Sequence, residues 1–344
     1  MDVNIKGMLW TKYYEAIEHN LPLPPPVAIS LDLTDICNLR CYWCNSKRMK
    51  NILSFEYVKE LVDILHIWGV KGVCLGGGGE PCLNSYLGKI AKYITSLDMD
   101  VGIITNGTEL TKDLADILVD NSKFCSVSLD SATKETWMKL KGLDERQYNK
   151  LRSNIAYLCK IAKDKRVDTT AKFLVVPENQ YEIYQFVLLA KNIGFKSVLI
   201  RPADLSSANN PITEKKVFDV AKINEQLLKA KDLESSDFRI YPNFGRQKED
   251  GFYSPKNTFK KCYASPIHVM CLANKYAYIC ANHKWEDRFK LCKSLDIVKY
   301  WNSKEHRELL RSIIPCRDCR RCSFGNYNQM AELYLDDIII RNIP

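Results

Sequence analysis

Residues 35–44 read DICNLRCYWC and place Cys37, Cys41 and Cys44 in a C-x3-C-x2-C triplet on one short loop, directly after a strand-like run. Three thiolates this close in the chain can reach a single metal centre. A four-iron cluster normally takes four cysteine ligands, so a loop with three leaves one iron open to bind another molecule. A closed zinc site and buried free thiols are the alternatives, although zinc sites are usually built from paired C-x2-C motifs.

The composition is that of a globular protein large enough for one barrel or two domains. The chain has 344 residues, of which 46% are hydrophobic and 26% charged. No apolar run approaches the ~18–20 residues of a membrane span, and the first residues, MDVNIKG, are not a signal peptide. We therefore expect a cytoplasmic protein without a membrane partner, in which fourteen reduced cysteines favour metal binding over disulfides. The net charge of +9 permits an anionic substrate or nucleic acid and demands neither.

The first two thirds of the chain alternate strand-like and helical segments, which predicts parallel βαβ units. Both a doubly wound sheet and a partial barrel fit this alternation. Strands are expected at residues 27–33, 72–75, 101–105, 124–130, 169–176 and 197–201, and helices near residues 54–68, 86–97, 110–119, 147–162 and 181–193.

Polar residues recur on one face of three of these strands, and this favours the partial barrel. Alternate residues of a strand share a face, and a fully buried parallel strand would be apolar on both faces. A polar face suits a barrel whose interior is a binding cavity, whereas polar ends of ordinary strands are the alternative. The residues are Ser30 and Asp32 in the first strand, Ser126, Ser128 and Asp130 in the fourth, and Thr170 and Lys172 in the fifth.

The second strand ends in the sequence GGGGEP at residues 76–81, at the edge where parallel barrels carry their catalytic loops. Glycines let a backbone approach a ligand closely, and a carboxylate can accept a hydrogen bond from an ammonium group. A Gly-Gly-Glu-Pro motif one βα unit after the cysteine triplet resembles the radical S-adenosylmethionine (radical SAM) enzymes. The resemblance covers roughly residues 27 to 205.

The resemblance implies where the two cofactors would bind. The cysteine triplet would hold a [4Fe-4S] cluster whose open iron chelates SAM, and electrons would come from a donor such as flavodoxin or ferredoxin. By the same resemblance, Gly78, Gly79 and Glu80 hold the SAM amino group, and Asn106 lies close to it. Ser128 and Asp130 fall where ribose and methionine contacts are made, Lys172 would pair with the methionine carboxylate through its inward position, and Trp43, Val176 and Arg201 would border the adenine.

A second set of seven cysteines lies between residues 262 and 322. Cys262 and Cys280 flank a hairpin-like segment at 266–279, and a helical stretch at 297–313 precedes Cys316, Cys319 and Cys322. This resembles the SPASM and twitch auxiliary-cluster domains of radical SAM enzymes, although the usual hairpin glycine and the longer SPASM cysteine spacing are absent. The resemblance implies a second [4Fe-4S] cluster on Cys262, Cys280, Cys316 and Cys319. Cys322 is an alternate ligand, Cys271 or Cys292 could replace one of the hairpin pair, and a zinc knuckle is the competing interpretation.

The expected organisation is an α/β protein: a partial (β/α)6 barrel with a smaller C-terminal cysteine-rich domain. We expect an N-terminal extension at 1–25, the barrel at 26–205, a bridging segment at 206–253 that begins with a loop, and the auxiliary domain at 254–344. The expected activity is reductive SAM cleavage followed by hydrogen abstraction from a peptide or small molecule, and the substrate could be anionic because Lys256, Lys260, Lys261, Arg317, Arg320 and Arg321 adjoin the second cysteine set. Radical modification of a nucleotide or nucleic acid, and a non-catalytic iron–sulphur or zinc protein, are the alternatives.

Overall fold

The computed structural model describes residues 11–41, 43–203, 218–242, 259–319, 322 and 324–335, and the chain forms two compact units. The terminal unit comprises residues 1–31, 60–72 and 253–344, and the central unit comprises residues 32–59 and 73–252. This grouping differs from the expected domain boundaries, because the first strand belongs with the C-terminal strands. The loop expected at 206–213 lies outside the described residues, as does the end of the expected bridging segment from residue 243.

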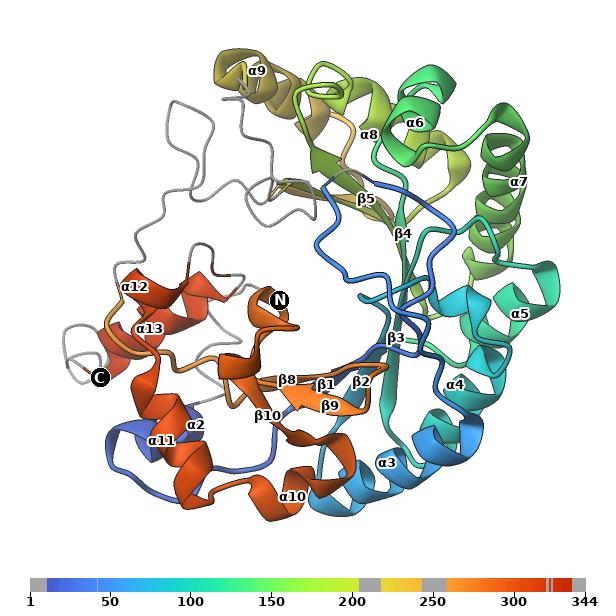
Figure 1. Ribbon diagram of the computed structural model, residues 1–344. Helices are drawn as coiled ribbons and strands as arrows, with labels where there is room; N and C mark the ends of the chain where they lie inside the picture. The colour runs from blue at the N-terminus through green and yellow to red at the C-terminus, as the bar shows by residue number, and fades with distance from the viewer. Residues whose placement is uncertain are drawn as a thin grey trace. The chain divides into compact units, whose positions relative to one another are not determined.

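The central unit is built on parallel strands in the order in which they occur in the chain, β2 to β7. Strands β2 to β6 are each followed by one or more helices, and Figure 1 shows α4, α5 and α7 side by side along one face of the strands. The strands are β2 (Gly72–Leu75), β3 (Asp100–Thr105), β4 (Phe124–Ser128), β5 (Asp168–Val175), β6 (Ser197–Pro202) and β7 (Arg239–Pro242). The helices are α4 (Leu87–Ser96), α5 (Lys112–Asp120), α6 (Lys134–Lys141), α7 (Glu145–Ala162), α8 (Ile183–Ile193) and α9 (Val220–Lys231).

Strand β5 shows why one face of these strands is polar. Ala171, Phe173 and Val175 are fully buried, and the Phe173 ring lies 4.6 Å from that of Phe186 in α8. Thr170, Lys172 and Leu174 alternate with them and are half-buried. Because successive side chains of a strand point to opposite faces, the helices cover the apolar face and Lys172 lies on the other. This is the alternation that the sequence predicts.

The terminal unit combines the first strand with a C-terminal hairpin. Strand β1 (Ala28–Leu31) pairs in parallel with β8 (His268–Cys271), which continues through antiparallel β9 (Tyr276–Tyr278) to β10 (Lys290–Lys293). The helices of this unit are α2 (Thr11–Glu18), α10 (Ile297–Tyr300), α11 (Lys304–Ser312), α12 (Pro315–Asp318) and α13 (Gly325–Leu335); α3 (Phe55–Trp68) has residues in both units.

The helix expected at 297–313 is two helices, α10 and α11. Asn302 separates them with a left-handed φ of 65°, a conformation that stops a helix and that asparagine tolerates. Its side-chain amide donates to the Leu23 carbonyl at 2.9 Å and accepts from the Leu23 N–H at 2.8 Å. The break therefore fastens the segment before β1 to the start of α11.

The sequence patterns did not predict α6, α13 or β10. Helix α6 (KETWMKLK) buries Trp137, Leu140 and Lys141. Because one of these buried residues is a lysine, the helical periodicity of apolar residues is weak. No helix in the described part of the chain is long and apolar enough to cross a membrane.

Candidate active site

The cysteine loop lies in the central unit and is fastened at its base. The Asp35 N–H donates to the Asn51 carbonyl at 3.0 Å, and the Asn51 side chain donates back to the Asp35 carboxylate at 2.7 Å. The Thr34 hydroxyl accepts from the Ile36 N–H at 3.0 Å. The loop therefore begins from a rigid base immediately before Cys37.

Burial and nearby charges disfavour the thiolate forms of Cys37 and Cys41. Burial, with smaller effects of Glu80, Cys41 and Cys44, raises the pKa of Cys37 to about 11 against a lowering hydrogen bond from the Leu39 backbone. Burial also raises the pKa of Cys41, while Lys141 lowers it. These mutual effects place the three thiols near one another, and a positive metal centre would deprotonate them.

The donor set fits an iron–sulphur cluster. The three side chains are all cysteine, and such a cluster binds each thiolate on a different iron. Among the described residues, no three His, Cys, Asp or Glu side chains lie close enough together to share one metal ion.

The glycine loop after β2 packs directly on the cysteine loop. The Gly79 N–H donates to the Thr34 carbonyl at 2.7 Å, and the Glu80 N–H donates to the Ile36 carbonyl at 2.8 Å. A Cβ atom on Gly79 would lie 2.1 Å from the Ile36 carbonyl oxygen, and one on Gly78 would lie 2.5 Å from the Asp32 carboxylate. Glycine is therefore required at both positions for the two loops to meet.

Glu80 connects the glycine loop to the loop after β3. Its side chain is 2% exposed, and its oxygens accept from the Thr105 hydroxyl, the Asn106 N–H at 2.6 Å and the Cys82 N–H at 3.1 Å. Burial raises the pKa of this carboxyl group, and those hydrogen bonds oppose the rise. A carboxylate offers about four acceptor positions, so most of this side chain serves to fix the loops.

Asn106 completes the connection between the same loops. Its amide donates to the Asn38 side chain in the cysteine loop at 2.9 Å, and its oxygen accepts from the N–H and the hydroxyl of Thr108. The Asn38 amide donates in turn to the Thr108 hydroxyl at 2.7 Å. The observed contacts of Asn106 thus position the cysteine loop.

Lys172 and Arg201 form a cationic face on neighbouring strands β5 and β6. Burial lowers the pKa of Lys172 to about 8, and the nearby Arg201 lowers it further, whereas Cys74 and Asp130 raise it. Ser128 on β4 lies directly opposite Lys172 in the β4–β5 register. Two buried cations beside a hydroxyl suit a carboxylate-bearing ligand.

Asp130 follows β4 and forms a buried ion pair with Lys141, a residue that the sequence patterns did not single out. The carboxylate accepts from the Lys141 ammonium and from the Leu174 N–H at 2.7 Å. Each side chain of the pair is 1% exposed. The lysine ammonium lies 4.9 Å from the centre of the Trp43 ring. No apolar pattern distinguishes a buried lysine from an exposed one, so sequence spacing could not find it.

Four cysteines come together in the terminal unit: Cys262, Cys280, Cys319 and Cys322. Burial raises the pKa of Cys280 to about 12, with further contributions from Cys262 and Cys322. Burial is the largest cause that raises the pKa of Cys319, and the other three thiols raise it by smaller amounts. These mutual effects define the four as one group.

Asn328 of α13 holds this group from the side. Its amide lies 3.6 Å from the Cys322 sulphur, and its oxygen accepts from the backbone N–H groups of Tyr263 and Ala264, at 2.7 and 3.0 Å. Asn328 is fully buried. One asparagine therefore links the two ends of the cysteine group.

The sequence analysis expects Cys316 in the ligand set and Cys322 as the alternate ligand. The structure places Cys322 with Cys262, Cys280 and Cys319, and the ligand set itself stays a prediction. Cys316 is exposed at the first turn of α12. Cys271 is buried on β8, where it raises the pKa of Cys292, so these two belong together elsewhere in the unit. In a C-x2-C-x2-C run the spacing alone does not distinguish the first cysteine from the last, and the start of α12 at Pro315 turns Cys316 outward.

Residues 31–190 match the model of the radical SAM superfamily. The matched segment, just under half of the chain, is a radical SAM domain. It is 28% identical over 175 residues to a probable GTP 3',8-cyclase of Saccharolobus islandicus (strain M.14.25 / Kamchatka #1), covering 49% of this chain and 54% of the relative. It is 26% identical over 182 residues to the antilisterial bacteriocin subtilosin biosynthesis protein AlbA of Bacillus subtilis (strain 168), covering 51% and 39%. The chain thus spans about half, or less, of the length of these curated relatives.

Solved structures share the fold over most of the chain. Streptococcus suis SuiB bound to S-adenosylmethionine has a TM-score of 0.66 at 15% identity, covering 87% of this chain and 70% of SuiB. The enzyme anSMEcpe with bound AdoMet and the Cp18Cys peptide has a TM-score of 0.63 at 16% identity, covering 89% and 88%. The predicted radical SAM family and α/β fold class, with a C-terminal cysteine-rich region, are confirmed.

Trp43 and Val176, expected to border the SAM adenine, are both buried. The Val176 N–H donates to the Asn179 side chain at 2.7 Å, and its carbonyl accepts from the Asn179 N–H at 3.1 Å. These hydrogen bonds make the Val176 backbone part of a turn after β5.

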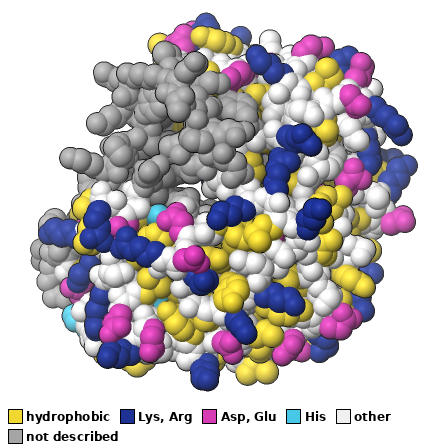
Figure 2. Space-filling view, in the orientation of Figure 1, with side chains coloured by type: hydrophobic (Ala, Val, Ile, Leu, Met, Phe, Trp, Pro, Cys, Tyr) yellow, Lys and Arg dark blue, Asp and Glu magenta, His cyan; other side chains and the backbone are white. Residues whose placement is uncertain are grey.

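Two of the basic residues beside the second cysteine set form ion pairs with acids. Lys261 contacts Glu18 at 2.7 Å, and Arg317 contacts Asp318 at 2.8 Å. Lys256, Arg320 and Arg321 lie outside the described residues. On the face shown in Figure 2, described Lys and Arg side chains are interspersed with acidic ones.

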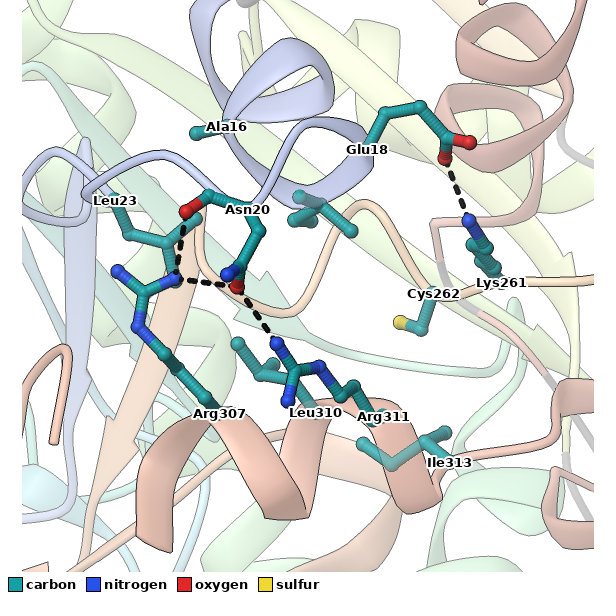
Figure 3. A pocket seen from close by; sticks show the side chains of 11 residues that line it. Ala16, Glu18, Asn20, Leu23, Lys261, Cys262, Arg307, Leu310, Arg311 and Ile313 are labelled. Carbon is teal, nitrogen blue, oxygen red and sulfur yellow. Dashed lines mark hydrogen bonds and ion pairs between the residues drawn. The ribbon is translucent and has the colours of Figure 1, made fainter. Parts of the chain in front are cut away.

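Cys262 also lines a pocket of about 320 Å³ between α2, the turn after it and α11. Figure 3 shows Arg307 and Arg311 of α11 both directed at Asn20, at 3.0 and 2.7 Å from its side-chain oxygen. Arg307 also donates to the Leu21 carbonyl and to Asn302. These arginines hold the turn after α2 and so shape the wall next to Cys262.

We predict that Gly79→Ala disrupts the cysteine loop, because its methyl group would collide with the Ile36 carbonyl. The iron that binds to the first cysteine set, about half of the total for two four-iron clusters, should be lost. Iron and sulphide analysis after anaerobic reconstitution measures this. Gly88→Ala is the matched control, since its nearest contact is the flexible end of Ile117 at 3.2 Å. Full iron content in Gly79→Ala would contradict the required close approach.

Proposed function

We propose that this protein is an enzyme that cleaves SAM reductively and abstracts a hydrogen atom from a substrate C–H bond. The observation that carries the proposal is the direct hydrogen bonding of the glycine loop to a loop of three cysteines. When bound, a [4Fe-4S] cluster would supply one electron to SAM. SAM would then yield methionine and a 5'-deoxyadenosyl radical, which would take a hydrogen atom from the substrate. The protein's own residues bind, orient and shield these groups.

The residues of the candidate site have separate roles in this proposal. Cys37, Cys41 and Cys44 would hold the cluster, and the glycine loop would present its backbone to the methionine end of SAM. Lys172 and Arg201 are placed to receive the methionine carboxylate, with Ser128 beside them. The contacts of Glu80, Asn106 and Asp130 support a positioning role in place of the direct SAM contacts expected from the sequence.

For the terminal unit, we propose a second [4Fe-4S] cluster on Cys262, Cys280, Cys319 and Cys322. Four partly buried thiols that interact with one another match the all-cysteine ligand set of such a cluster. A second cluster would accept an electron from a substrate radical or lie against the substrate.

A peptide is the favoured substrate. Two of the fold neighbours, SuiB and anSMEcpe, are described with a bound precursor peptide or peptide, and the Bacillus subtilis relative is named for bacteriocin biosynthesis. The second candidate is a nucleotide, since other relatives are named GTP 3',8-cyclases. The ion pairs of Lys261 and Arg317 reduce the positive charge available for an anion in the terminal unit. A flavodoxin or ferredoxin is the proposed electron donor, and the cytoplasm the proposed location.

The proposal predicts about eight irons and eight sulphides per chain after anaerobic purification. Reduced protein supplied with SAM should release 5'-deoxyadenosine and methionine, measured by chromatography. A triple variant, Cys37→Ala/Cys41→Ala/Cys44→Ala, should lose about half of the iron and all SAM cleavage. Zinc in place of iron, or SAM cleavage by the triple variant, would refute the proposed function.

Cysteine-to-alanine variants distinguish the ligands of the second cluster. Cys319→Ala/Cys322→Ala should lose about half of the iron and retain substrate-independent SAM cleavage, because the first cysteine set lies in the other unit. Cys316→Ala should keep its iron, since that thiol is exposed. If Cys316→Ala loses iron and Cys322→Ala alone does not, the proposed ligand set is wrong.

SAM binding should weaken as the pH rises through about 8, because Lys172 then loses the charge that attracts the methionine carboxylate. A bound carboxylate favours the protonated amine, so the dissociation constant should rise up to tenfold per pH unit above that value. Equilibrium dialysis between pH 7 and 9.5 measures it. Lys172→Met should bind SAM more weakly at pH 7 and lose this dependence. A pH-independent wild-type affinity would remove Lys172 from the site.

A further inference from the structure

The Asp130–Lys141 ion pair lies beside the cysteine loop. The Lys141 ammonium lies over the ring of Trp43, the residue between Cys41 and Cys44. The Lys141 carbonyl accepts from the Arg40 N–H at 3.1 Å, next to Cys41. Both the backbone and the side chain of Lys141 therefore contact the segment that carries the cysteines.

Backbone contacts fix both members of the pair. Gly142 ends α6 with a φ of 68° and donates its N–H to the Met138 carbonyl, so Lys141 is the last residue of a capped helix. Asp130 has a φ of 61°, donates its N–H to the Lys172 carbonyl at 3.1 Å, and accepts from the Asn179 side chain at 2.8 Å. A non-glycine residue held at positive φ by several hydrogen bonds is a fixed anchor.

Burying this ion pair between α6 and the end of β4 has a high desolvation free energy. Removing an ammonium and a carboxylate from water costs several kcal/mol per ion, and apolar side chains of similar volume often do as well. A buried charge is useful where another charge must be stabilised. The Asp130 carboxylate forms an ion pair with the Lys141 ammonium, and this pairing stabilises the charged form of the lysine beside the cysteine loop.

We propose that Lys141, held in place by Asp130, is a fixed positive charge that stabilises the added electron on the cluster of Cys37, Cys41 and Cys44. This inference rests on the proposed function. One electron converts an oxidised cluster to a reduced one with one more negative charge. A buried cation favours the reduced form and raises the reduction potential, whereas the Asp130 carboxylate opposes part of that effect.

Substitutions of Lys141 and Asp130 are therefore expected to shift the reduction potential in opposite directions. Lys141→Gln removes the cation and should lower the reduction potential. Asp130→Asn leaves the cation uncompensated and should raise it. If the ion pair served only to fasten α6, either variant would lower stability without moving the potential in opposite directions.

The test is a potentiometric titration of the full-length holoprotein, followed by electron paramagnetic resonance of the cluster whose signal changes when SAM is added. We expect Lys141→Gln to lower the ratio of reduced to oxidised cluster about tenfold at a fixed potential, which is about 59 mV for one electron. Asp130→Asn should raise that ratio. Lys139→Gln removes an exposed lysine from the same helix and should change it less than twofold.

Two results would overturn the inference: unchanged potentials, or shifts of the same sign in both variants, with iron retained. If either single variant fails to hold iron, Lys141→Met/Asp130→Leu replaces the pair by apolar groups, and its potential should fall below that of the wild type. An unchanged potential in this double variant also overturns the inference. Wild-type protein without iron would instead refute the proposed function, so the two failures are distinguishable.

Discussion

The site depends on the contact between the glycine loop and the cysteine loop. Two backbone hydrogen bonds, from Gly79 to Thr34 and from Glu80 to Ile36, join them at a separation that admits no side chain. The buried Glu80 carboxylate then connects the glycine loop to the loop after β3, and Asn106 returns from there to the cysteine loop. Three loops from separate βα units thus form one closed network of hydrogen bonds. Each loop limits the conformations open to the others.

This network changes how the motif residues should be interpreted. A motif shows which residue types recur at a given spacing. It does not show which of them contact a ligand and which only hold the backbone that contacts the ligand. Glu80, Asn106 and Asp130 use their polar atoms mainly on neighbouring loops or on Lys141. Lys172 and Arg201 instead bring two like charges close together on neighbouring strands, an arrangement that an anionic ligand would stabilise.

The strands and the cysteine loop were predictable from sequence because their signals are local. Alternating apolar residues and glycine or proline boundaries mark β2 to β6, and the cysteine spacing marks the loop. Helix α6 was not predictable because its buried face includes a lysine, and the partner of that lysine, Asp130, is eleven residues away in another element. The position of Cys322 also depends on long-range contacts, since Asn328 lies 3.6 Å from its sulphur and accepts hydrogen bonds from the Tyr263 and Ala264 backbone. The compact units likewise depend on the pairing of β1 with β8, which no local pattern contains.

The pairing of β1 with β8 has a consequence for the order of assembly. Ala28 of β1 faces His268 of β8, so 240 residues of chain separate partners in adjacent strands. A ribosome delivers the N-terminal strand first, and at about 5–20 residues per second its partner follows many seconds later. During that interval β1 lacks its C-terminal neighbour, while the cysteine loop directly after it is already outside the ribosome. We therefore expect the terminal unit to become compact only after the C-terminal strands have been synthesised.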